Sequence, residues 1–177
     1  MYRFLFSSLP VLWLALFVLP VNFAVAAEMQ IEIDIPKLDV AEYHRPYIAL
    51  WIEHPDKRAV THLSVWYDTA MKNGGGEEWL KDLRQWWRRG GRDLSMPVDG
   101  ISGATRPAGK HHLRFGSDHA VLAKLTAGNY VLVVEAVREV GGREVLNIPF
   151  QWPPKEIVSI SAKGERELGL VKMTLNQ

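Results

Sequence analysis

Residues 130–150 read YVLVVEAVREVGGREVLNIPF, and this stretch decides the fold class of the chain. Two runs rich in β-branched residues, Tyr130 to Arg138 and Arg143 to Phe150, lie on either side of Gly141-Gly142. Glycine adopts positive φ without steric cost, and tight turns of that kind match the twist of paired strands. We therefore predict a β-hairpin with its tight turn at the two glycines.

Further strand patterns occur along the rest of the chain. Between Met29 and Ile35 apolar and charged residues alternate, as in a half-buried strand. The apolar runs Tyr47 to Ile52 and Val60 to Tyr67 are expected to pair across a turn. Two more alternating segments, Ile157 to Ala162 and Leu168 to Leu175, follow a pair of prolines. About seven strands predict a mainly β fold, an antiparallel β-sandwich of immunoglobulin-like type.

One segment, Glu77 to Arg89, breaks the strand pattern. Acidic residues begin it, arginines finish it and Gly90-Gly91 provides a stop, which suits the helix dipole and helix capping. Its large apolar residues recur at helical spacing, with charged residues on the opposite side: Trp79, Leu80, Leu83, Trp86 and Trp87. We predict one amphipathic helix inserted in the sandwich, with Trp79 and Trp86 in the core.

The first 26 residues have the composition of a secretory signal peptide. Arg3 is the only charge before an apolar run, and Ala24-Val25-Ala26 offers a small-residue cleavage site. The run is short for a membrane span. We predict cleavage after Ala26, a single domain over residues 27–177 and a periplasmic or otherwise extracytoplasmic location. An uncleaved membrane anchor is the alternative.

Composition excludes several classes of function. The chain has 21 Lys and Arg against 20 Asp and Glu, so no basic surplus is available for a nucleic-acid backbone. It has no cysteine, which excludes disulfides, thiol catalysis and cysteine-ligated metal centres. Its six histidines form no established ligand motif, so no metal site is predicted. Hydrolase motifs such as Gly-x-Ser-x-Gly and His-Glu-x-x-His are absent.

The segment Pro97 to Pro107 contains the motif that bears on chemistry. Its flanking prolines and two internal glycines predict a loop with defined turns, not a strand or helix. Its centre, Asp99-x-x-Ser102-Gly103-Ala104-Thr105, resembles the Asp-x-x-Ser/Thr-Gly-Ala-Ser/Thr motif of covalently flavinylated extracytoplasmic proteins. These include the FMN-carrying subunits of bacterial sodium-pumping and Rnf-type electron-transport complexes. In them a flavin transferase, using FAD and a divalent metal, joins the last hydroxyl to FMN through a phosphoester.

This resemblance implies that Thr105 is the attachment point of covalent FMN, and that Asp99, Ser102, Gly103 and Ala104 form a recognition loop. A phosphoester needs an exposed hydroxyl, and small neighbours let the transferase approach the backbone closely. Asp99 could order the loop, serve as a recognition handle or act as a base in the transferase site, and the sequence leaves these roles open. Alternatively, Asp99 and Ser102 only cap a turn.

The charges and tryptophans near the motif bear on whether a flavin is attached there. Between residues 84 and 114 seven cationic residues outnumber two acidic ones, a surplus that would favour a phosphate and a reduced flavin. Arg106 is the nearest of them to Thr105, and Trp87 is the tryptophan predicted to contact the flavin. The same cations could instead form a solvated face that pairs with acids elsewhere.

A second resemblance covers most of the mature chain. The chain resembles the bacterial periplasmic family called domain of unknown function 2271 in four segments: 43–53 (YHRPYIALWIE), 65–67 (VWY), 86–89 (WWRR) and 99–107. The resemblance implies neighbours of two kinds, flavin transferases and PepSY-type membrane reductases. It therefore implies a flavin-bearing electron carrier.

Together with the export signal, the two resemblances imply an exported electron-transfer protein with FMN on Thr105. Such a protein is a substrate of the transferase, and a carrier more than an enzyme with a substrate of its own. The alternative is a cofactor-free periplasmic immunoglobulin-like module for binding or assembly, which contacts a partner through its sandwich edges and its Trp-bearing helix. Contact with a membrane is expected only through a partner or an uncleaved signal peptide.

Overall fold

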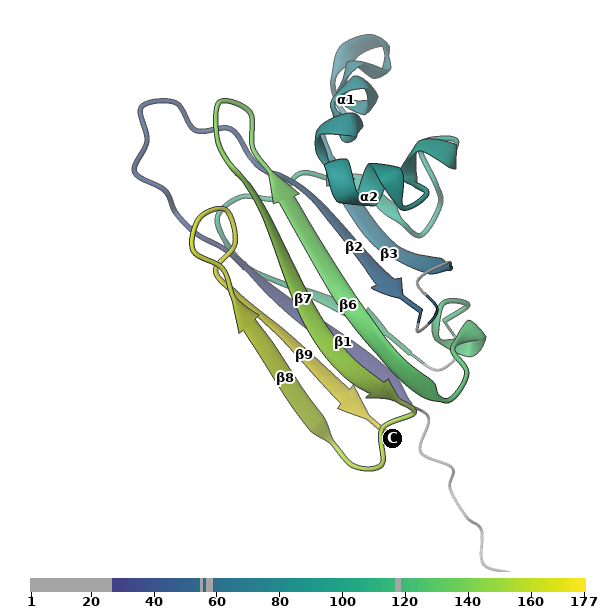
Figure 1. Ribbon diagram of the computed structural model, residues 1–177. Coiled ribbons are helices and arrows are strands. Elements are labelled where there is room, and N and C mark those ends of the chain that lie inside the picture. Colours follow the sequence, from purple (N-terminus) through teal and green to yellow (C-terminus); the bar gives the residue numbers. More distant parts are fainter. Residues whose placement is uncertain (1–26, 55, 57–58, 117–118) are drawn as a thin grey trace, which may run out of the picture.

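The computed structural model describes residues 27–54, 56, 59–116 and 119–177, and shows two β-sheets packed face to face (Figure 1). One sheet has the strand order β5-β1-β9-β8, and the other has the order β4-β3-β2-β6-β7. All neighbouring strands are antiparallel except β3 and β4, which are parallel. The predicted β-sandwich is confirmed. The predicted signal peptide, residues 1–26, lies outside the described residues.

Nine strands are present in the described part of the chain: β1 Glu28–Ile35, β2 Tyr47–Glu53, β3 Val60–Tyr67, β4 Ser102–Ala104, β5 Gly109–Phe115, β6 Gly128–Val137, β7 Arg143–Trp152, β8 Val158–Lys163 and β9 Leu170–Asn176. The helical elements are short: α1 Gly75–Glu78, α2 Arg84–Arg88 and the 3₁₀ turns Lys72–Gly74, Leu80–Asp82, Gly91–Asp93 and Leu122–Lys124. The sequence did not predict β4 and β5. Both are edge strands, and β5 (GKHHLRF) is too polar to show a strand pattern.

The main core lies between the two sheets. The inward residues of β1 are at most 2% exposed, which confirms the predicted alternation: Met29, Ile31, Ile33 and Ile35. They meet alternate residues of β9 on the same sheet, and of β2 and β6 on the facing sheet. Burial of such side chains is the main source of stability in a sandwich of this size.

A second core covers the outer face of the five-stranded sheet, under the helical segment (Figure 1). Leu80, Leu83 and Trp86 pack there on outward-facing side chains of the sheet, among them Trp51 and Val133. Strand β2 is therefore buried on both faces. This explains why residues 47–52 form a continuous apolar run and do not alternate.

The segment over this second core is not the single helix that was predicted. α1 ends at Glu78, a 3₁₀ turn follows, and Leu83 (φ −72°, ψ 69°) leaves the helical region before α2. Glu135, fully buried on β6, accepts the backbone N–H groups of Gln85 (3.1 Å) and Trp86 (2.7 Å) and so caps α2. The carboxylate therefore binds two N–H groups that a continuous helix would pair with carbonyls of the preceding turn.

The hairpin of β6 and β7 is confirmed, but the prediction for its turn is wrong. Positive φ occurs at Val140 (52°) and not at Gly141-Gly142. The turn spans residues 138–142, with the N–H of Arg138 donating to the carbonyl of Gly142 (3.1 Å). A Cβ on Gly141 would lie 2.6 Å from Cζ of Arg138. Glycine is needed there for close packing against the arginine.

Candidate functional site

The motif lies at the edge of the five-stranded sheet, where β4 pairs with β3. The N–H of Val65 donates to the carbonyl of Ile101 (2.8 Å), and the N–H of Thr105 donates to the carbonyl of Tyr67 (3.0 Å). Residues 102–104 are therefore a strand, and the prediction that they belong to a loop is wrong. A three-residue strand held by backbone hydrogen bonds leaves no periodic side-chain pattern, so the sequence did not indicate it.

Ser102 closes the turn that leads into β4. Its Oγ accepts the N–H of Val98 (2.8 Å), and its own N–H donates to the carbonyl of Val98 (2.9 Å). Gly100 at the tip of this turn has a φ of 70°. Asp99 is exposed and makes no hydrogen bond or ion pair with any other described residue. Ser102 therefore orders the turn, which leaves Asp99 accessible to a partner.

Gly103 and Arg106 both lie against the indole of Trp66. A Cβ on Gly103 would lie 3.4 Å from Cδ1 of Trp66, and the guanidinium carbon of Arg106 lies 4.1 Å from the ring centroid. Burial lowers the pKa of Arg106, although the group remains a cation. Arg106 therefore packs on Trp66 and does not line the pocket that Thr105 reaches.

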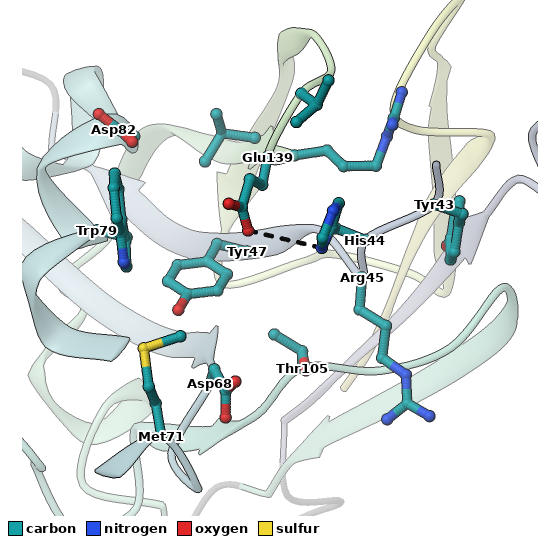
Figure 2. Close-up of a pocket in the computed structure, with 13 residues that line it drawn as sticks. Tyr43, His44, Arg45, Tyr47, Asp68, Met71, Trp79, Asp82, Thr105 and Glu139 are labelled. Atoms are coloured by element: carbon teal, nitrogen blue, oxygen red, sulfur yellow. Dashed lines mark ion pairs between the residues drawn. The ribbon is translucent and has the colours of Figure 1, made fainter. Parts of the chain in front are cut away.

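Thr105 lines a pocket of about 590 Å³ at one end of the second sheet (Figure 2). This volume lies within the usual range for small-molecule sites. The pocket walls come from four parts of the chain besides Thr105: the segment before β2, the end of β3, the helical segment and the turn after β6. The lining residues drawn in Figure 2 include Tyr43, His44, Arg45, Tyr47, Asp68, Met71, Trp79, Asp82 and Glu139.

Aromatic side chains stand on opposite sides of this pocket. Figure 2 shows Trp79 on one side, Tyr43 on the other and Tyr47 between them. Trp79 is 46% exposed, so the prediction that it lies in the core is wrong, whereas Trp86 is fully buried as predicted. Trp87 packs against Trp86 in the second core, with ring centroids 6.4 Å apart, and does not line the pocket. The structure therefore brings Trp79, and not Trp87, to the site of Thr105.

Two tyrosines of this site were missed as site residues, although both lie in the segment 43–53 that carries the family resemblance. Tyr43 is 38% exposed. Burial raises the pKa of Tyr47, and the carboxylates of Asp68 and Glu139 raise it further. The phenol of Tyr47 therefore stays protonated at neutral pH.

The pocket contains charges of both signs. On the acidic side, Glu139 Oε2 lies 3.5 Å from Nδ1 of His44, and Asp68 and Asp82 line the wall. On the basic side, Arg45 is exposed and forms no ion pair with the described residues. A ligand here can therefore meet a cation and carboxylates at different points of its surface.

The basic surplus of residues 84–114 does not converge on Thr105. Three of its members form ion pairs with acids on other elements, as the alternative interpretation expected: Arg89 with Glu53 (3.1 Å), Lys110 with Glu32 (3.1 Å) and Arg114 with Glu28 (2.7 Å). The described part of the chain holds no cluster of three His, Asp or Glu side chains that could bind a metal ion.

Fold and site together define a β-sandwich with a ligand-sized pocket at one end of its five-stranded sheet. The chain belongs to the family described as predicted periplasmic protein, domain of unknown function 2271, whose model matches residues 28–170. The match confirms the family that the sequence resembles and the predicted periplasmic location. The chain has no match among curated proteins or solved structures. Over the residues that the structure describes, no helix has the length and apolar character needed to cross a membrane.

Proposed function

We propose that this periplasmic protein carries FMN covalently on Thr105 and transfers electrons between a membrane reductase and an extracytoplasmic acceptor. The position of Thr105 carries the proposal. It is the last residue of the Asp-x-x-Ser-Gly-Ala-Thr motif, it follows the edge strand β4, and it lines a pocket of about 590 Å³. The motif and a ligand-sized pocket therefore coincide at one hydroxyl-bearing residue.

The residues around Thr105 fit a flavin. Tyr43 and Trp79 offer aromatic faces to a planar ring, and large aromatic faces suit such ligands. Arg45 offers an exposed cation to a phosphate. Nη1 of Arg138 is a buried donor without a hydrogen-bond partner in the described part of the molecule. FMN would supply electron-transfer chemistry that the side chains of a cysteine-free protein do not provide.

The attachment step balances with FAD as the donor. In the transferase site, Oγ of Thr105 attacks the phosphorus of the FMN half of FAD, and the hydroxyl proton passes to a base. The new bond joins Oγ to phosphorus, the pyrophosphate P–O bond breaks, and AMP leaves. Strand β4 is the edge of its sheet, so on one side no other described strand lies next to it to block the transferase.

The test is the intact mass of the denatured mature protein, produced in the periplasm with and without a co-expressed flavin transferase. We expect a transferase-dependent gain equal to FMN minus water, located on the peptide that contains Thr105. Thr105→Ala removes the acceptor hydroxyl and should show no gain. Thr105→Ser restores a hydroxyl at the same position and should recover it.

Two results would contradict the proposal. One is flavin retained covalently by folded Thr105→Ala. The other is no gain in the parent protein while the transferase modifies a known acceptor in the same cells. Circular dichroism of each variant separates loss of the acceptor from loss of the fold.

One observation favours the cofactor-free binding module as a second candidate. Four large apolar side chains that line the pocket are exposed, and together they could also receive a protein partner: Tyr43, Met71, Trp79 and Val140. Colourless protein purified from cells with an active transferase would support this second function.

A further inference from the structure

Arg138 holds a buried hydrogen-bond donor that is paired with none of the residues described by the structure. Its side chain is 6% exposed and forms a two-point ion pair with Glu167, Nε to Oε2 at 2.9 Å and Nη2 to Oε1 at 3.2 Å. Nη1 has no partner among the described residues. A guanidinium has five N–H donors, and leaving buried ones unpaired is unfavourable. The ion pair by itself accounts for only two of its nitrogens.

The guanidinium is held in one place by the turn around it. Glu167 also accepts the N–H of Gly142 at 2.7 Å, which ties the arginine's partner to the same turn. Gly141 lies so close that a Cβ there would be 2.6 Å from Cζ of Arg138. A donor fixed in this way loses little freedom when it binds a ligand.

Arg138 and Thr105 line the same pocket. The ring centroid of Tyr43 lies 5.9 Å from Cζ of Arg138, and Tyr43 is 38% exposed. Tyr43 belongs to the connection between β1 and β2, which has no regular secondary structure. Nη1 itself is buried, so a ligand can reach it only after a neighbouring side chain moves, and Tyr43 is an exposed ring beside the guanidinium.

We propose that Arg138 recognises the N1–C2=O edge of a flavin ring through Nη1, which a rotation of the Tyr43 side chain exposes to the pocket. The inference rests on the proposed function, because it assigns a ring contact within the same site. The N1–C2=O edge presents hydrogen-bond acceptors to a donor, and it gains negative charge when the ring is reduced. A fixed cation at this edge therefore binds the ring and favours its reduced form.

Arg138→Lys isolates the contribution of Nη1. Lysine keeps a cation opposite Glu167 but cannot also donate from the position of Nη1, because its ammonium is a single point. Arg143→Lys is the matched control, since Arg143 pairs with buried Glu135 in the neighbouring strand but does not line the pocket. Thermal unfolding of each variant verifies the fold. If Arg138→Lys does not fold, the pair Arg138→Gln with Glu167→Gln removes both buried charges together.

The first measurement uses lumiflavin, the ring without a phosphate, and protein that carries Thr105→Ala. Covalent attachment therefore plays no part, and failure of the proposed function is seen separately in the mass experiment. We expect quenching of tryptophan fluorescence on binding, with affinity reduced on the order of tenfold by Arg138→Lys and unchanged by Arg143→Lys. Equal affinity in the two variants, or no binding by the parent, would overturn the inference.

The second measurement is the reduction potential of FMN-loaded protein. A hydrogen bond from Nη1 strengthens as the N1–C2=O edge becomes negative, so its loss in Arg138→Lys should lower the potential, by about 30 mV for each tenfold loss of preference in a two-electron couple. Arg143→Lys should leave it unchanged. A potential that does not respond to Arg138→Lys contradicts the assignment to the N1–C2=O edge.

Discussion

Glu144 orders a turn through hydrogen bonds to its backbone. Its carboxylate accepts the N–H groups of residues 165–168 at 2.7 to 3.2 Å, and so orders the turn between β8 and β9. Burial acts to raise the pKa of Glu144, but the four backbone hydrogen bonds outweigh it and the pKa is lowered. The same turn carries Glu167, so Glu144 helps to position the partner of Arg138.

Glu144→Gln should therefore destabilise the protein in a pH-dependent way. A carboxylate whose pKa is lowered by folding stabilises the protein above its unfolded pKa of about 4.3, and this stabilisation is lost as pH falls through the folded value. At pH 7 we expect the variant to lose on the order of 1 kcal/mol in free energy of unfolding. Urea denaturation should show the difference shrinking below about pH 4.3. A difference independent of pH would contradict this account, and the exposed Glu156→Gln is the control.

At the level of elements, the helical segment shows that residues at helical spacing need not be equally buried. Trp79 and Trp86 share the apolar stripe of an ideal helix, yet one is 46% exposed and the other is fully buried. Leu83 is non-helical and separates the two short helices, and the hydrogen bonds to Glu135 hold only α2 on the sheet. As a result, one tryptophan serves the second core and the other serves the pocket.

Alanine substitutions should distinguish these two roles. Trp86→Ala empties a fully buried site against the sheet and should cost about 3–5 kcal/mol in free energy of unfolding. Trp79→Ala removes an exposed ring and should cost less than about 1 kcal/mol. Urea denaturation measures both, and each variant serves as the control for the other. Equal losses would show that the segment packs differently from the structure described.

At the level of the whole molecule, the two ends of the described chain form the middle of one sheet. β1 lies between β5 and β9, and β9 lies between β1 and β8. The inward residues of β9 are buried in the main core: Val171, Met173 and Leu175. Both β1 and β9 are therefore integral parts of the sandwich and its core.

Deletion of residues 170–177 should therefore prevent folding of the entire domain. It removes the strand that joins β1 to β8 and exposes the main core. We expect loss of cooperative thermal unfolding by circular dichroism and rapid digestion by a protease. A chain that starts at residue 27 keeps all nine described strands and should fold, which makes it the control. Cooperative unfolding of the C-terminal deletion would indicate that the sandwich is not one folding unit.

The sequence by itself determined the strands that have a strong side-chain pattern. The alternation at Met29 to Ile35 and the apolar runs at β2, β3 and β6 mark the residues that are buried. Burial along a strand leaves such a pattern in neighbouring residues, so it can be read locally from the sequence. The sandwich followed from these strands, and the position of the motif at Thr105 followed from residue identity alone. Strands β4 and β5 escaped prediction because β4 has only three residues and β5 consists mostly of polar ones, so neither shows a side-chain pattern.

Only the tertiary structure decided which residues surround Thr105. The pocket joins residues 43–47, 68–82, 105 and 137–140, and no periodicity relates segments so far apart in the chain. The break in the helix depends on Glu135, which lies about fifty positions later in the sequence. The exposure of Trp79 and the unpaired Nη1 of Arg138 arise from long-range packing in the same way. Local pattern therefore determined the strands, whereas contacts between distant segments determined the site.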